Sequence, residues 1–138
     1  MDWTNPKEHI TPHFTVRDAT FLHAFNRLAT TADGMDTAKL IVLCQKMEQI
    51  RALLGYPINV HCMYRSPEYN LKIGAPAHDV HALSEACDFD CFPHLTIVQV
   101  QAILEPKLEE LGIRMERNTK TWVHVDVHPV IHQRYFNV

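Results

Sequence analysis

Hydrophobic residues recur every three or four positions between Met35 and Gly55, which predicts the longest helix of the chain. Asp36 or Thr37 is suited to cap the start of this helix, and Gly55 is suited to end it. The residues that would form its apolar face are Leu40, Ile41, Leu43, Cys44, Met47, Ile50, Leu53 and Leu54.

Two more helices are expected further along the chain. Thr96 is placed to cap a long helix that Gly112 closes, although Pro106 should kink or shorten it because proline cannot donate a backbone hydrogen bond. The run Ser66-Pro67-Glu68 combines an N-cap, a proline at the first helical position and an acidic first turn. A short helix should follow it and end before Gly74.

The pattern of hydrophobic and polar positions is less regular at the beginning of the chain. Residues 1–13 read as an irregular N-terminal arm. From Phe14 the chain should enter a helical stretch that runs to about Leu28, and Asp33-Gly34 should break it.

Four segments alternate or are rich in β-formers, and two of them flank a polar turn at residues 117–120. The expected strands are Ile58–Tyr64, Glu85–Cys91, Ile113–Glu116 and Trp122–Val127. Helices and strands therefore come in mixed order with a hairpin near the end. This order predicts a single α+β domain over residues 1–138, with a small, mostly antiparallel sheet packed against helices.

The strand at Trp122–Val127 has two chemically different faces. Val123, Val125 and Val127 share one face, which should be the core face, while His124 and Asp126 share the other with Trp122. An imidazole and a carboxylate are costly to bury without a partner such as a metal ion.

The strand at Glu85–Cys91 repeats this arrangement, with Asp88 and Asp90 opposite Cys87 and Phe89. If the two strands are neighbours, Asp88 and His124 can converge, and His81 on the preceding loop can join them. Two imidazoles and one carboxylate make a three-ligand zinc site on one face of the sheet, with the fourth position open for water.

The composition is rich in histidine and argues against nucleic-acid binding and a membrane span. The chain has 138 residues, ten of them histidine, with 46% hydrophobic residues and a net charge of -3, so a single globular core is expected. It has no basic stripe for nucleic acid and no apolar run long enough to span a bilayer. Without an export signal at the N-terminus, we expect a cytoplasmic protein with its four cysteines reduced.

The cysteines permit a rival site. His78 and His81 together with Cys87 and Cys91 could form a closed, structural Cys2His2 zinc site. Such a site would require both thiols to face the metal, whereas strand alternation directs them away from Asp88.

Three segments resemble motifs of the family M15 zinc peptidases, in the same order. The run from His81 to Asp88 resembles the signature S-x-H-x-x-G-x-A-x-D, the run from Tyr64 to Asn70 resembles Y-R-S-P-x-x-N, and the run from Trp122 to Asp126 resembles W-V-H-V-D. The resemblance extends from about Phe14 to the C-terminus. That family includes D-Ala-D-Ala carboxypeptidases and phage L-alanyl-D-glutamate endolysins.

The resemblance implies a zinc-dependent peptidase that binds one Zn²⁺ ion through His81, Asp88 and His124. It implies that Arg65 clamps a substrate carboxylate or steadies the oxyanion. For the proton acceptor, Asp126 is preferred because it shares a strand face with His124. Its alternative role is to orient that ligand, and Glu116 is then the reserve candidate.

Three positions depart from the family pattern. Asp79 stands in place of the family serine and would repel a terminal carboxylate. Ser84 stands in place of a glycine, so the loop has no glycine at this position to adopt a left-handed conformation. Thr121 occupies the position where some members carry a catalytic carboxylate.

The expected function is hydrolysis of peptide bonds in peptidoglycan stem peptides or their precursors, by a monomer that does not bind nucleic acid or membranes. Release during phage lysis would bring such a protein to the cell wall. The alternative is a non-catalytic zinc-binding module of a virion or of a cell-wall-binding protein.

Overall fold

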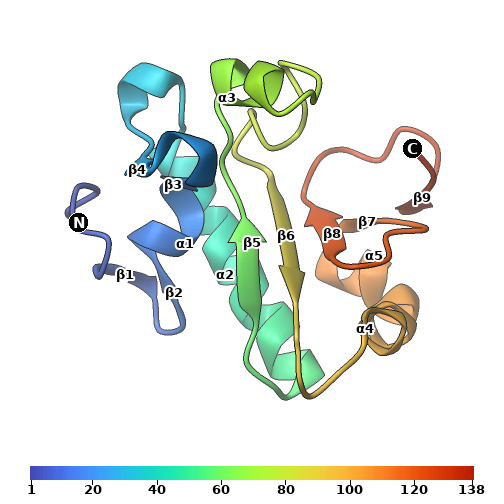
Figure 1. Ribbon diagram of the computed structural model, residues 1–138. Helices are drawn as coiled ribbons and strands as arrows, with labels where there is room; N and C mark the ends of the chain where they lie inside the picture. The colour runs from blue at the N-terminus through green and yellow to red at the C-terminus, as the bar shows by residue number, and fades with distance from the viewer.

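In the computed structural model, which describes residues 1–138, the chain forms one small α+β domain (Figure 1). The helices are α1 (Val16–Thr20), α2 (Thr37–Leu54), α3 (Pro67–Lys72), α4 (Ile97–Leu104) and α5 (Leu108–Leu111), with short 3-10 turns η1 (His23–Phe25), η2 (Thr31–Asp33) and η3 (Glu105–Lys107). The strands are β1 (His9–Thr11), β2 (Phe14–Thr15), β3 (Phe21–Leu22), β4 (Arg27–Leu28), β5 (Asn59–Cys62), β6 (Ala86–Asp90), β7 (Arg114–Glu116), β8 (Val123–Asp126) and β9 (Tyr135–Phe136).

The main sheet has five strands in the order β5-β6-β8-β7-β9. All neighbouring pairs are antiparallel except β7 and β9, which run parallel. The predicted mostly antiparallel sheet with a hairpin between β7 and β8 is therefore confirmed. Strand β9 brings the C-terminal segment back beside β7 and adds an edge that the hydrophobic pattern did not predict.

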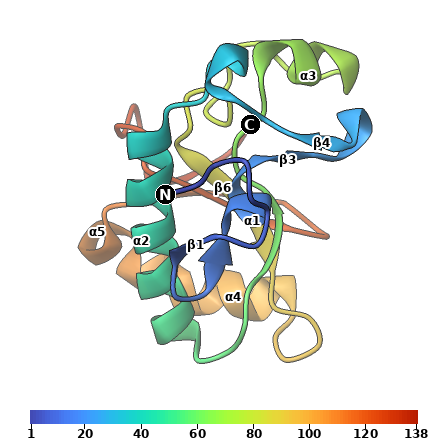
Figure 2. The same cartoon turned by 90° about the vertical axis from the view of Figure 1, so that its left-hand side faces the viewer.

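Helix α2 forms where the pattern predicted it. The Asp36 side chain accepts a hydrogen bond from the Lys39 amide at its start, and Gly55 ends it in the left-handed conformation. The buried residues of α2 are Leu40, Leu43, Cys44, Met47, Ile50 and Leu54. This face packs on one side of the main sheet, as the two views show (Figures 1 and 2).

Pro106 divides the second predicted long helix. Thr96 caps α4 in a reciprocal box with Gln99, and the chain then passes through η3, which contains Pro106, before α5 ends at Gly112. The shortening is the expected effect of a residue without a backbone N–H.

The prediction of a helix from Phe14 to Leu28 is wrong beyond its first turns. Only α1 is helical, because the chain leaves it to form the hairpin of β3 and β4, with Phe21 opposite Leu28. The carbonyl of Ala19 accepts a hydrogen bond from Tyr64, so tertiary pairing replaces the helical ladder here. The N-terminal arm also contains a regular element, since β1 pairs with β2.

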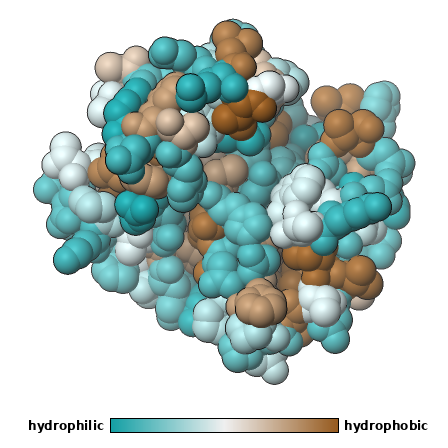
Figure 3. Space-filling view, in the orientation of Figure 1, coloured by the Kyte–Doolittle hydropathy of each residue, from teal (hydrophilic) through white to brown (hydrophobic).

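The core lies between α2 and the sheet. Val123 and Val125 of β8 and Cys87 and Phe89 of β6 all belong to it, as strand alternation predicted. The opposite face of these strands carries the polar residues, and the middle of the face seen in Figure 3 is mostly hydrophilic. No helix of the chain has both the length and the hydrophobicity needed to cross a membrane.

Candidate metal centre

Three candidate ligand atoms converge on the open face of the sheet. Strands β6 and β8 pair so that Asp88 and His124 are direct cross-strand partners. The Asp88 Oδ1 atom lies 2.8 Å from His124 Nδ1 and 3.2 Å from His81 Nε2. The register of two strands thus brings together the three side chains that the sequence indicated.

The loop before β6 fixes the orientation of His81. This residue is 2% exposed, and its Nδ1 atom lies 2.7 Å from the carbonyl oxygen of Met63. A carbonyl can only accept, so Nδ1 carries the proton and donates it. The Nε2 atom then faces Asp88 and is the nitrogen that can bind a metal ion once it has released its own proton.

The orientation of His124 is fixed by a buried carboxylate. Its Nε2 atom lies 2.9 Å from Asp126 Oδ2, which leaves Nδ1 to face Asp88. Asp126 is itself fully buried and accepts two hydrogen bonds from Arg114. Both imidazoles therefore have one nitrogen engaged outside the centre and one directed into it, as in carboxylate–histidine–metal arrangements.

The charges of the three side chains compensate one another in the metal-free protein. Burial lowers the pKa of His81, but the neighbouring Asp88 and Cys62 outweigh burial and raise that pKa to about 10. Burial raises the pKa of Asp88, yet hydrogen bonds from His124 and His81 hold it well below its ordinary value. In the metal-free protein, protons on the imidazoles thus compensate a charged carboxylate.

The donor types and the two distances to Asp88 are compatible with a tetrahedral ion. Nitrogen and oxygen ligands at roughly 2.0–2.1 Å from zinc lie about 3.4 Å apart in a tetrahedron. The separations of 2.8 and 3.2 Å around Asp88 Oδ1 are slightly shorter, so small outward side-chain movements would admit an ion. Two imidazoles with one carboxylate leave a fourth position free.

Cys62 lies beside the same cluster, and the sequence analysis did not single it out. It is paired in register with Asp88 across β5 and β6, and its Sγ atom lies 3.7 Å from Asp88 Oδ2 and 3.9 Å from His81 Nδ1. Cys62, His81 and Asp88 form the group of three whose ligand atoms all lie within 4.8 Å of one another and could hold a metal ion, and His124 is not part of that group. Only the pairing of β5 with β6 brings the thiol here, so no local sequence pattern could have identified it.

His81, Asp88 and His124 line part of a cavity of about 330 Å³. Its lining includes Arg65, Asp79, Glu116, Trp122 and Phe136. Burial raises the pKa of Glu116, whose carboxyl group is half-buried in this wall. The lining does not include Asp126.

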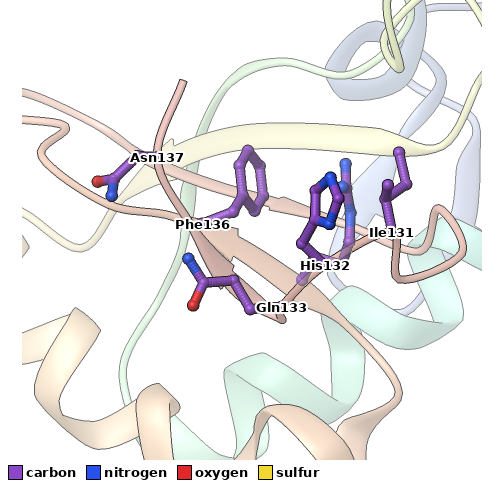
Figure 4. A pocket seen from close by; sticks show the side chains of 6 residues that line it. Ile131, His132, Gln133, Phe136 and Asn137 are labelled. Atoms are coloured by element: carbon purple, nitrogen blue, oxygen red, sulfur yellow. The ribbon is translucent and has the colours of Figure 1, made fainter.

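A second cavity, of about 350 Å³, lies against the C-terminal segment and shares Arg114 and Phe136 with the first (Figure 4). Ile131, His132 and Gln133 complete much of its wall. It has no group of three candidate ligands, so the chemistry is concentrated in the first cavity.

The rival closed site does not form. Cys87 and Cys91 are fully buried in the hydrophobic core, on the face opposite Asp88, and His78 is exposed. Burial raises the pKa of Cys91 to about 11, so this thiol stays protonated. The Cys2His2 alternative is therefore wrong.

Two departures from the signature have structural consequences. Ser84 adopts the left-handed conformation, with φ of 61°, and its hydroxyl accepts a hydrogen bond from the Asp36 amide. Asp79 Oδ2 accepts a hydrogen bond of 2.9 Å from Arg65. The loop thus keeps a glycine-like backbone at residue 84 and acquires an ion pair at residue 79.

A mixed domain whose sheet presents two imidazoles and a carboxylate to an accessible cavity has the architecture of a metal-dependent hydrolase. A family model described as Peptidase M15 matches residues 14–126. The chain therefore belongs to the Peptidase M15 family and is a peptidase. No curated protein and no solved structure matches it significantly.

Proposed function

We propose that this chain is a zinc-dependent peptidase that hydrolyses peptide bonds in peptidoglycan stem peptides or their precursors. Membership of the Peptidase M15 family supports this proposal. The observation that carries it is the convergence of His81 Nε2 and His124 Nδ1 on Asp88 Oδ1. These three side chains would hold the ion, because one nitrogen of each imidazole is directed at Asp88.

A zinc ion bound there supplies Lewis-acid activation of a water molecule and of the scissile carbonyl. The chain must then provide a group that accepts a proton and passes it to the leaving amine. Glu116 fills this role in our proposal, because its carboxyl group lines the cavity and its pKa is raised by burial.

This assignment replaces our preference for Asp126. The Asp126 carboxylate is fully buried, bound by both Arg114 hydrogen bonds and by His124, and does not line the cavity. Its geometry suits the alternative role of fixing the orientation and basicity of His124.

The test combines metal analysis with a cell-wall assay. Protein purified without added metal is analysed for bound ions, loaded with zinc, and incubated with purified peptidoglycan. New amino termini should appear, and their identity by mass spectrometry gives the bond that is cut. The matched control is His124→Ala, which should lose both zinc and activity.

If the wild-type protein binds zinc but releases no amino termini, the peptidase proposal fails in favour of a non-catalytic zinc-binding module. If elemental analysis finds no stoichiometric metal under any loading condition, the ligand set itself is refuted. A phage lysis role is part of the proposal and predicts lysis when the protein is expressed together with a holin.

A further inference from the structure

Arg65 and Asp79 form an ion pair in the wall of the cavity. Arg65 Nη2 donates to Asp79 Oδ2 at 2.9 Å, and both side chains are less than one fifth exposed. The Arg65 amide also donates to the carbonyl of His81, which ties this arginine to the first candidate ligand. The arginine near the metal centre therefore has a built-in anionic partner.

The other oxygen of Asp79 has a structural role that does not need a charge. Asp79 Oδ1 accepts hydrogen bonds of 3.0 Å from the Ala82 amide and from the Asn70 side chain. A hydroxyl or an amide oxygen at this position can accept from the Ala82 amide equally well. Replacement of Asp79 by serine or asparagine should therefore preserve the loop while it removes the negative charge.

The charges around the cavity compensate one another. Arg65 is paired with Asp79, and Arg114 is paired with the buried Asp126. Two further carboxylates line the wall: Asp88, which is paired with His81 and His124, and Glu116. No side-chain cation is left without a partner to receive a second carboxylate from a substrate.

Neutral acceptors remain suitable for this arginine. Arg65 lines the cavity, and only one of its guanidinium nitrogens, Nη2, donates to Asp79, so the side chain retains donor capacity. A peptide carbonyl can use such donors without the repulsion that Asp79 would exert on a carboxylate.

We propose that Asp79 makes this chain selective for internal peptide bonds, so that it acts as an endopeptidase and discriminates against a free carboxylate on the residue after the scissile bond. This inference rests on the proposed peptidase function and specifies its substrate class. Hydrolysis adds water across the bond, so the acyl side becomes a carboxylate and the other side becomes an amino group.

The experiment compares two peptides that differ only at the C-terminus. Both carry the sequence acetyl-L-Lys-D-Ala-D-Ala, one as the free acid and the other as the carboxamide. Binding to the zinc-loaded protein is measured by calorimetry and cleavage by mass spectrometry, for wild type, Asp79→Ser and Asp79→Asn. Circular dichroism and zinc content verify that the variants are folded and loaded.

The wild-type protein should bind the carboxamide roughly tenfold more tightly than the acid, the factor expected for one like-charge contact near a surface. Both variants should reduce this ratio to about one or invert it, because they free the Arg65 charge. The inference is overturned if wild type binds the acid equally well or better, if neither peptide binds at millimolar concentration, or if both variants keep the wild-type ratio.

The binding data separate the two proposals. A preference for the carboxamide without cleavage of either peptide or of peptidoglycan would refute the peptidase function and leave the discrimination by Asp79 as a property of binding alone. Cleavage of peptidoglycan together with equal affinity for the two peptides would refute the selectivity alone.

Discussion

Arg114 and Asp126 lie opposite each other on the neighbouring strands β7 and β8 and are joined by two hydrogen bonds of 2.7 and 2.9 Å. Asp126 is completely buried and also accepts from His124. Burial raises the pKa of Asp126, but hydrogen bonds from His124 and Arg114 outweigh burial and hold the pKa below its ordinary value. One ion pair thus supports the sheet and orients a candidate ligand.

Removal of one member of this pair should be costly. Arg114→Met leaves Asp126 buried without its main partner, so the free energy of unfolding of the metal-free protein should fall by about 3–5 kcal/mol. Urea denaturation measures this change. The double variant Arg114→Met with Asp126→Leu should recover most of that stability, yet bind zinc roughly 10–100-fold more weakly because His124 loses its orienting partner. Wild-type zinc affinity in the double variant would contradict the role given to Asp126.

Glu116→Gln should separate catalysis from metal binding. We expect it to retain zinc and to lower kcat by about 10²–10⁴, the usual contribution of a general base. The comparison variant is Asp126→Asn, whose main effect should be on zinc affinity, with kcat substantially recovered at saturating zinc. If Asp126→Asn instead keeps its zinc affinity and loses kcat by the larger factor, the proton acceptor is Asp126.

Glu116→Gln should also change the stability of the metal-free protein in a pH-dependent way. The pKa of Glu116 is raised above 4.5 in the metal-free folded protein, so its ionised form is less favourable there than in the unfolded chain. This cost is absent at pH values below 4.5 and develops as the pH rises through the raised pKa. Glu116→Gln should therefore raise the melting temperature of the metal-free protein, relative to wild type, by more at pH 7 than at pH 4. An equal effect at the two pH values would contradict this expectation.

Zinc should stabilise the folded protein without being required for folding. The imidazole protons compensate Asp88 when the metal is absent, so the chelated protein should still unfold cooperatively. At a free zinc concentration about 100 times the Kd, the gain should be about 2.7 kcal/mol. Differential scanning fluorimetry with and without a chelator measures this shift, and His124→Ala should abolish it.

Ser84 offers a matched pair of substitutions. Its left-handed backbone should cost about 1 kcal/mol in a residue with a side chain, and its hydrogen bond to the Asp36 amide should contribute about as much. Ser84→Gly removes both the backbone strain and the hydrogen bond, so the free energy of unfolding should stay within about 1 kcal/mol of wild type. Ser84→Ala keeps the strain but removes the hydrogen bond, so the free energy of unfolding should fall by about 1 kcal/mol. Equal stability of the alanine variant and wild type would show that the hydrogen bond is energetically unimportant.

The local parts of this structure could be predicted because short-range physics decides them. Periodicity and capping predicted α2 and α3, and Pro106 predicted the interruption after α4. Alternation assigned Phe89 to the core face of β6 and Asp88 to the open face. A strand fixes the side on which each residue lies as soon as the strand exists.

Long-range contacts decided the rest. The residues from Phe21 to Leu28 became a hairpin because their backbone groups found strand and loop partners, which no local propensity indicates. Pairing of β5 with β6 brought Cys62 beside Asp88, and pairing of β7 with β8 covered Asp126 with Arg114.

The sequence by itself thus determined which side chains face the candidate centre from each strand: Asp88 from β6 and His124 from β8. Only the tertiary structure decided which carboxylate stays accessible, Glu116 rather than Asp126, and which charge stands beside Arg65. The reason is that facing is a property of one strand's backbone geometry, whereas burial and charge pairing depend on partners that the fold brings from distant parts of the chain.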